Sequence, residues 1–252
     1  MKIVCSFAFG LLVCATGLFA QTIEPLPMRT MGVSGNVETM IYVPAVTGPT
    51  KAALVLHTSS GLRDADHRYA QKLAGEGYVV VVPAFMKAYG IIEETRRHTW
   101  TTYGKHLYAD FLSIITAVSQ EYKITKEGFY AVGFSNGGHW AALLAARGDV
   151  QGGVSYYGAF SEGGADTSLS TFREAVTSRS HPVLILHGTH DAVVSSQYAV
   201  TLEGLYRREG APVSAHYFHG AGHSFERRLG ITANQAAATE SWRLALKFLQ
   251  EN

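Results

Sequence analysis

Cysteine is almost absent from this chain, which has only two, Cys5 and Cys14. Both lie within the first 20 residues, where a lysine precedes a mostly apolar run that closes on the small residue Ala20. This pattern is typical of a secretory signal peptide that is cleaved from the mature protein. We therefore expect residues 1–20 to be a signal peptide, and residues 21–252 to contain neither a disulfide nor a cysteine nucleophile.

The same segment leaves two other interpretations of the N-terminus open. A membrane anchor would need about 20 continuous apolar residues, and Ser6, Gly10 and Gly17 interrupt this run. A lipoprotein signal would attach a lipid at Cys14, although the preceding residue, Val13, is larger than such signals usually carry. We expect cleavage, and hence an exported protein of the periplasm or the extracellular space with no membrane contact afterwards.

Charge is also sparse and balanced. Asp, Glu, Lys and Arg make up 16% of the residues, with 21 basic against 20 acidic side chains and no block of basic residues. Such a chain lacks the positive patch that binds nucleic acids or anionic membrane surfaces. We expect a small-molecule partner instead. Because 47% of the residues are hydrophobic, we expect residues 21–252 to form one globular domain with a sizeable core.

Motifs for binding metals and phosphates are missing too. No HExxH pair and no GxxxxGK(S/T) loop occurs, and the densest histidine cluster is HYFHGAGH, with His216, His219 and His223. On a strand, residues three apart point to opposite faces, so His216 and His219 are poorly placed to share one ion. We therefore expect neither a catalytic metal nor a cofactor.

Alternating apolar and amphipathic segments indicate the fold. Nearly continuous apolar runs, typical of buried parallel strands, occupy residues 37–43, 52–57, 78–82, 128–134, 152–158, 182–188 and 213–219. Apolar residues at helical spacing occupy residues 64–75, 103–121, 137–147, 195–209 and 233–250. This alternation predicts an α/β fold, a doubly wound and mostly parallel sheet with helices on both faces. Ligands bind such sheets beyond the carboxyl ends of the strands, so we expect the chemistry there.

GFSNGG, residues 133–138, follows one of the apolar runs and precedes a helical segment. This is the context of a nucleophile elbow, in which glycines give room for a sharp turn that exposes the central serine. Ser135 is then a candidate nucleophile, and the backbone N–H of Asn136 is a candidate oxyanion donor. A glycine-rich turn with a capping serine explains the motif equally well, so the assignment depends on a base and a carboxylate elsewhere.

Both of these groups follow later strand-like segments, in the order Ser, Asp, His. Asp191 lies in HGTHD, just beyond the run 182–188, and His223 lies in the glycine-containing loop AGHSF after the last run. Asp191 alone is explained by a helix cap and His223 alone by a surface loop, but their joint placement favours a Ser–His–Asp triad. The loop after residues 52–57 contains Ser59, whose backbone N–H we expect to be the second oxyanion donor.

Three stretches give the chain a resemblance to the dienelactone hydrolase family of the α/β-hydrolase superfamily, from about Lys51 to the C-terminus. They are SSGLRDADHRYAQKLAGEGYVVVVPAFM, GFSNGG with the downstream VSYYG, and HGTHD with GAGHSFERR. The resemblance implies an α/β-hydrolase fold. It also implies a nucleophile, an orienting carboxylate, a base and two oxyanion N–H groups at Ser135, Asp191, His223, Ser59 and Asn136.

Other positions bear on the substrate. The resemblance implies that Arg227 binds a substrate carboxylate, although an ordinary solvated helix residue explains it equally well. Family members that act on dienelactone use a cysteine nucleophile held by a glutamate, where this chain has Ser135 and Thr58. In this family, the strand after the first helix usually ends in Pro-Asp. In this chain the corresponding residues are Pro83 and Ala84. These departures favour a serine carboxylesterase over an enzyme for dienelactone.

We therefore expect a carboxylic ester hydrolase that cleaves ester or lactone bonds of a small molecule through Ser135, His223, Asp191 and an acyl-enzyme. Two alternatives stay open: a non-catalytic binding protein on the same fold, and a serine peptidase or acyltransferase with the same triad. The two long connections, residues 84–102 and 159–180, are expected to serve function. Aromatic residues near the carboxyl edge are expected to line a pocket or belong to the core: Tyr89, Trp100, Tyr103, Tyr157 and Phe160.

Overall fold

A computed structural model describes residues 24–252 apart from 33–34, 46–47, 162–167 and 229. The expected signal peptide, residues 1–20, and the alternative lipidation site Cys14 lie outside the described residues, so cleavage and export stay predictions. In the part of the chain that is described, no helix combines the length and the apolar character needed to cross a bilayer.

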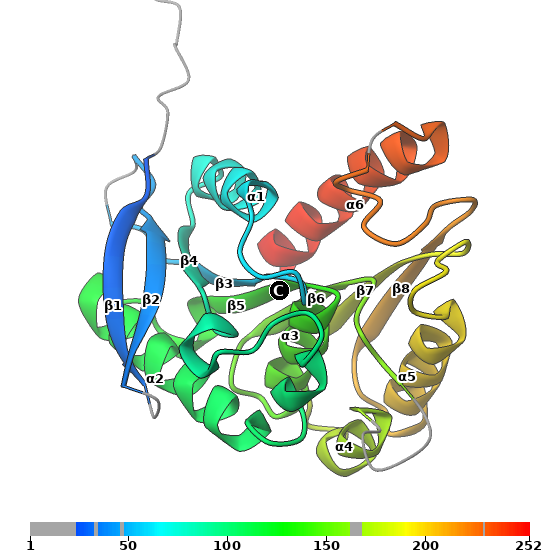
Figure 1. The fold of residues 1–252 in the computed structure, drawn as a ribbon, viewed down its shortest axis with the longest axis horizontal. Helices are drawn as coiled ribbons and strands as arrows, with labels where there is room; N and C mark the ends of the chain where they lie inside the picture. The colour runs from blue at the N-terminus through cyan, green and yellow to red at the C-terminus, as the bar shows by residue number, and fades with distance from the viewer. Residues whose placement is uncertain (1–23, 33–34, 46–47, 162–167, 229) are drawn as a thin grey trace, which may run out of the picture.

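The described residues form one eight-stranded sheet, in the order β1-β2-β4-β3-β5-β6-β7-β8 (Figure 1). Strands β3 to β8 are parallel, and β2 joins β4 and β1 in antiparallel pairing. The mostly parallel α/β sheet expected from the sequence is confirmed. The strands are β1 Leu26–Gly32, β2 Gly35–Tyr42, β3 Ala52–Leu56, β4 Val79–Pro83, β5 Phe129–Phe134, β6 Gly152–Tyr156, β7 Val183–Gly188 and β8 Val213–Phe218.

Burial explains which strands could be predicted from the sequence. Every residue of β3, β4, β5, β6 and β7 is buried, because helices cover both faces, and such strands are apolar without alternation. At the sheet edge, β8 alternates partly buried with exposed side chains over most of its length. The opposite edge strand, β1, was not predicted. Its sequence LPMRTMG has no apolar run, and its backbone pairs with β2 alone.

Helices cover both faces of this sheet (Figure 1). Helices α1 and α6 pack on one face, and α2, α3, α4 and α5 pack on the other. Their bounds are α1 Asp64–Gly75, α2 Gly104–Tyr122, α3 Asn136–Ala146, α4 Ser168–Ala175, α5 Ser196–Arg208 and α6 Thr232–Glu251. The five expected helices are confirmed to within one residue at each end. Helix α4 corrects the expected loop 159–180: with only 8 residues it is too short for its apolar spacing to stand out.

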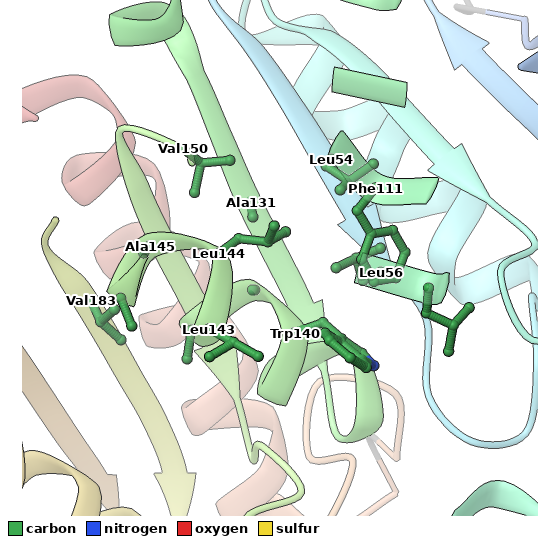
Figure 2. Close-up of a cluster of buried hydrophobic side chains, with 14 of the residues drawn as sticks. Leu54, Leu56, Phe111, Ala131, Trp140, Leu143, Leu144, Ala145, Val150 and Val183 are labelled. Carbon is green, nitrogen blue, oxygen red and sulfur yellow. The ribbon is translucent and has the colours of Figure 1, made fainter. Parts of the chain in front are cut away.

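The central helix α3 is the most deeply buried element beside the sheet. All of its residues are buried, and Trp140 and Leu144 pack in one core with Leu54, Leu56 and Ala131 of the neighbouring strands (Figure 2). A close-packed interior resists displacement of any one member. The turn that leads into α3 is therefore fixed in space, and the residue that makes this turn is Ser135.

Candidate active site

The turn between β5 and α3 places Ser135 at the carboxyl edge of the sheet. Strand β5 ends at Phe134 and α3 begins at Asn136, so one residue makes the turn, with φ 52° and ψ −108°. Positive φ strains a residue other than glycine, and hydrogen bonds to its backbone, two of them from outside α3, hold it there. The Ser135 N–H donates to the Tyr156 carbonyl at 3.0 Å, and the Ala159 N–H donates to the Ser135 carbonyl at 2.8 Å.

Two glycines allow this turn to be so tight. A Cβ on Gly133 would lie 1.9 Å from the Gly137 carbonyl oxygen, and a Cβ on Gly137 would lie 2.1 Å from the Leu56 carbonyl oxygen. Any side chain at either position would therefore force α3 away from the sheet. The same closeness lets the Gly137 N–H donate to the His57 carbonyl at 3.1 Å, which connects the turn to the loop after β3.

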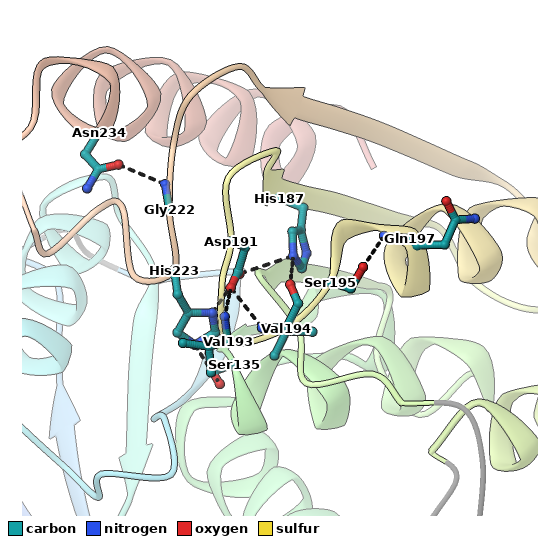
Figure 3. Close-up of polar contacts among 10 residues, drawn as sticks. All are labelled: Ser135, His187, Asp191, Val193, Val194, Ser195, Gln197, Gly222, His223 and Asn234. Atoms are coloured by element: carbon teal, nitrogen blue, oxygen red, sulfur yellow. Dashed lines mark hydrogen bonds and ion pairs between the residues drawn. The ribbon is translucent and has the colours of Figure 1, made fainter.

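The structure brings Ser135, His223 and Asp191 together (Figure 3). Ser135 Oγ lies 3.2 Å from His223 Nε2, and His223 Nδ1 lies 2.7 Å from Asp191 Oδ2. The three residues follow β5, β8 and β7, and parallel strands collect their carboxyl ends at one edge. Because a carboxylate only accepts, His223 donates from Nδ1 and leaves Nε2 free to accept the hydroxyl proton of Ser135.

Asp191 is a buried carboxylate that hydrogen bonds keep ionised. Burial raises the pKa of its carboxyl, but hydrogen bonds from His187, His223 and the backbone N–H of Val194 outweigh burial and hold that pKa well below its usual range. Its Oδ1 accepts from the N–H groups of Val193 and Val194, each at 2.8 Å. The negative charge that stabilises a protonated His223 is therefore present throughout the neutral pH range.

Ser59 and Asn136 lie on the two segments that meet at the turn. Asn136 begins α3, and Ser59 lies in the loop after β3. The Asn136 side chain joins these segments, since Nδ2 donates to Ser59 Oγ at 3.3 Å and to Thr99 Oγ1 at 3.1 Å. Among the described residues, neither the Ser59 N–H nor the Asn136 N–H has an acceptor. The fold therefore leaves both expected oxyanion donors unused.

The site contains two residues, Thr99 and His187, that the sequence did not identify as candidates. Thr99 accepts from the Asn136 amide while its own hydroxyl donates to the Arg96 carbonyl at 2.6 Å, which fixes the direction of the amide. His187 donates to Asp191 from the end of β7. Neither belongs to a motif with a known spacing, and only the fold brings each beside its partner.

Two nitrogens of the Arg227 guanidinium are already paired with carboxylates of this chain, and the substrate-binding role that the resemblance implied stays a prediction. Arg227 Nη2 lies 2.6 Å from Asp66 Oδ1, its Nε lies 2.5 Å from Glu226 Oε1, and the guanidinium stacks over the Phe134 ring. It is not an ordinary solvated helix residue, because its side chain is only 15% exposed and precedes α6. Arg227 connects α1 to the loop that holds His223.

Tyr157 and Glu226 extend this network to the imidazole. The Tyr157 hydroxyl donates to Glu226 Oε1 at 2.5 Å, and the phenol ring packs edge-on against His223 with ring centroids 4.6 Å apart. Burial raises the pKa of Glu226 and raises the pKa of Tyr157 well above its usual value, so the phenol stays protonated and keeps donating. Tyr157 also has a positive φ of 35°, so a second strained residue supports the site.

A cavity of about 920 Å³ lies between α2, α3 and α4. Its wall includes His139, one helical turn after Ser135, together with Trp100 and Trp140. The expected aromatic residues have different places: Trp100 lines this cavity, Tyr157 packs on His223, Phe160 is buried against His139 and Phe172, and Tyr89 packs against Tyr103.

The positions where the chain departs from the resemblance lie near the loop after β3. The Thr58 hydroxyl oxygen accepts the Ser60 N–H at 3.3 Å, so it shapes this loop. Ala84 lines a second cavity, of about 470 Å³, together with His57 and Met86. A small apolar residue therefore stands in the wall of a cavity next to the expected oxyanion loop.

No group of three or more His, Cys, Asp or Glu side chains is arranged to hold a metal ion in the described ranges. His216 lies on β8, whereas His219 lies beyond the end of that strand. The His219 ring packs against His190 instead, with centroids 5.8 Å apart.

Two buried neutral histidines lead us to expect that the fold loses stability in acid. Burial lowers the pKa of His57 to about 4 and that of His139 to about 3, whereas an unfolded histidine titrates near 6.5. Between about pH 6.5 and 4 the unfolded chain therefore binds more protons at these sites. The free energy of unfolding should fall with pH by up to about 2.7 kcal/mol per pH unit. Glu226, whose pKa burial raises, opposes part of this loss.

His139→Phe isolates one of these two histidines. A phenyl ring keeps the packing with Trp100, Trp140 and Phe172 but binds no proton. Urea unfolding from pH 4.5 to 8 should show a shallower pH dependence for this variant, with the value at pH 8 reporting the packing change alone. Equal slopes in the two proteins would contradict the expectation.

The sequence also matches a family model. The model of the dienelactone hydrolase family covers residues 37–252. The chain belongs to the dienelactone hydrolase family. Membership confirms the resemblance seen in the sequence and makes this chain a hydrolase with the α/β-hydrolase fold. No curated protein matches the sequence.

Solved structures share the fold. A protein assigned as a dienelactone hydrolase from Klebsiella pneumoniae subsp. pneumoniae MGH 78578 has a TM-score of 0.77 at 17% identity, over 91% of this chain and 99% of its own. A thermophilic esterase from Thermogutta terrifontis has a TM-score of 0.68 at 20% identity, over 92% and 93%. The acylaminoacyl peptidase of Pyrococcus horikoshii has a TM-score of 0.74 at 17% identity, over 91% of this chain and 42% of its own. At these identities the likeness concerns the fold, so the substrate has to be argued from the site.

Proposed function

We propose that this member of the dienelactone hydrolase family is a serine hydrolase that cleaves carboxylic ester or lactone bonds of a small molecule. Ser135 attacks the carbonyl carbon while His223 accepts the hydroxyl proton at Nε2 and Asp191 holds the imidazole through Nδ1. The backbone N–H groups of Ser59 and Asn136 stabilise the oxyanion. His223 then gives its proton to the leaving alcohol and activates the water that releases the acyl group.

The observation that carries this proposal is the 3.2 Å approach of Ser135 Oγ to His223 Nε2. A serine hydroxyl is a weak nucleophile until a base takes its proton. His223 can be that base because its Nδ1 is engaged by Asp191 at 2.7 Å, which leaves Nε2 as the accepting nitrogen. A serine that only forms a turn needs no such partner, and a non-catalytic binding protein has no use for an aligned base.

Two features favour neutral esters over other substrates. Two of the three guanidinium nitrogens of Arg227 are already paired with Asp66 and Glu226, which weakens pairing with a substrate carboxylate and disfavours dienelactone itself. The likeness to the acylaminoacyl peptidase covers less than half of that enzyme, 42% of its chain, and so lends little weight to peptide bonds.

The experiment is a substrate panel with the purified protein: p-nitrophenyl esters of increasing acyl length, small lactones, and acyl-amino-acid anilides. We expect turnover of esters or lactones and none of the anilides. A fluorophosphonate probe should label one serine per chain, and the labelled peptide should contain Ser135. Labelling at another residue would refute the proposed nucleophile, and anilide cleavage would favour the peptidase alternative.

A further inference from the structure

His187 is a second imidazole on the carboxylate of Asp191. It lies near the end of β7, and both side chains of this pair are fully buried. His187 Nε2 lies 3.2 Å from Asp191 Oδ2 and 3.0 Å from the Val194 carbonyl oxygen (Figure 3). Because a carbonyl oxygen only accepts, Nε2 carries a proton and donates it to the Val194 carbonyl, and Asp191 Oδ2 lies beside the same N–H group.

These contacts surround the carboxylate with donors. Oδ1 accepts two backbone N–H groups, from Val193 and Val194, at 2.8 Å each. Oδ2 accepts from His223 Nδ1 at 2.7 Å, and His187 Nε2 lies 3.2 Å from the same oxygen. The backbone donors and the two imidazoles approach different oxygens, so the plane of the carboxylate cannot turn without breaking one of them. His187 is the side-chain donor on Oδ2 that does not itself face Ser135.

We propose that His187 is a positioning residue for the reaction, an inference that rests on the proposed function. It has two effects on Asp191. It holds Oδ2 in the direction of His223, so that the imidazole keeps the tautomer and orientation that Ser135 needs. It also shares Oδ2 with His223, so the carboxylate does not interact with the base alone.

Other ionisable groups near the imidazole do not depend on this contact. Tyr157 packs against the His223 ring, Glu226 accepts from Tyr157, and Arg227 pairs with Glu226. All three approach from the end of β6 and from the loop after β8, on segments that do not include His187. A change at His187 therefore leaves these groups in place, and a shift in the pH profile reports the bond to Asp191.

Two substitutions separate donation from packing. His187→Leu fills the buried site with an apolar side chain of similar size and removes the donor. His187→Gln keeps a donor, since its amide nitrogen is four bonds from Cα, as Nε2 is in histidine. The measurements are kcat and KM for a p-nitrophenyl ester across pH 5 to 9, with thermal unfolding to compare the folds.

In His187→Leu, we expect the acid limb of the pH profile of kcat/KM to shift to higher pH by about half a pH unit or more. The reason is that Asp191 Oδ2 then interacts with His223 alone. We also expect kcat to fall roughly tenfold, the size of one hydrogen bond to a charged group, with KM little changed. His187→Gln should restore both towards wild type.

An acid limb in His187→Leu that coincides with wild type would overturn the proposal, as would equal losses in His187→Leu and His187→Gln. If His187→Leu does not fold, His187→Phe takes its place, because it keeps a ring without the donor. Failure of the proposed function is a separate result. Ester turnover that survives Ser135→Ala would refute the proposed function, whatever pH profile the His187 variants show.

Discussion

Ser135→Ala is expected to abolish ester turnover while the protein stays folded, with kcat/KM lower by about four to six orders of magnitude. The change removes Oγ, the atom that approaches His223 Nε2 at 3.2 Å, so no acyl-enzyme can form. The N–H groups of Ser59 and Asn136 remain, and a small residual rate above that in water is expected from them. Alanine has a Cβ as serine does, so the turn at φ 52° keeps its strain and stability should change little.

Ser155 provides the matched control for this variant. It is a fully buried serine on β6, and its hydroxyl has no hydrogen-bond partner within the described part of the chain. Ser155→Ala should therefore keep wild-type turnover and wild-type labelling by the fluorophosphonate probe. Steady-state kinetics and thermal unfolding compare the two variants. Turnover that persists in Ser135→Ala would mean that another group attacks the ester.

The parts of the fold that the sequence predicts are those where burial alone decides the pattern. VVVVP in β4 and VLILHG in β7 are buried along their whole length, so an apolar run without alternation identifies them. The strand and the α-helix that were not predicted depend on tertiary contacts instead. Strand β1 exists through its backbone pairing with β2, and the short α4 is held by Leu169 and Phe172, which pack into the core beneath it.

The same division holds within the site. Ser135, Asp191 and His223 could be predicted because each follows a strand, and a parallel sheet brings such positions to one edge. The partners of Arg227 could not be predicted, since Asp66 lies 161 positions away along the chain and no periodicity links the two. His187 was hidden for a different reason: it completes an apolar strand run, and only the turn after β7 brings Asp191 back to it.

Asp191→Asn is the second change with a large expected effect, a fall in kcat of about four orders of magnitude. An amide offers one accepting oxygen and one donating nitrogen. The N–H groups of Val193 and Val194 are fixed in the backbone, so the amide oxygen takes the Oδ1 position and the NH2 group faces His223. His223 then has to present an unprotonated Nδ1. Its proton moves to Nε2, which can no longer accept the hydroxyl proton of Ser135.

Steady-state turnover and the rate of fluorophosphonate labelling should fall together in Asp191→Asn, because both reactions need the same proton transfer from Ser135. Asp149→Asn is the matched control. That carboxylate accepts from the Tyr108 hydroxyl just beyond the C-terminal end of α3, whereas Ser135 precedes the N-terminal end, and an amide oxygen still accepts there. Full turnover is expected in the control. A rate within about tenfold of wild type in Asp191→Asn would show that His223 keeps its working tautomer without the carboxylate, and the role of Asp191 would then be structural.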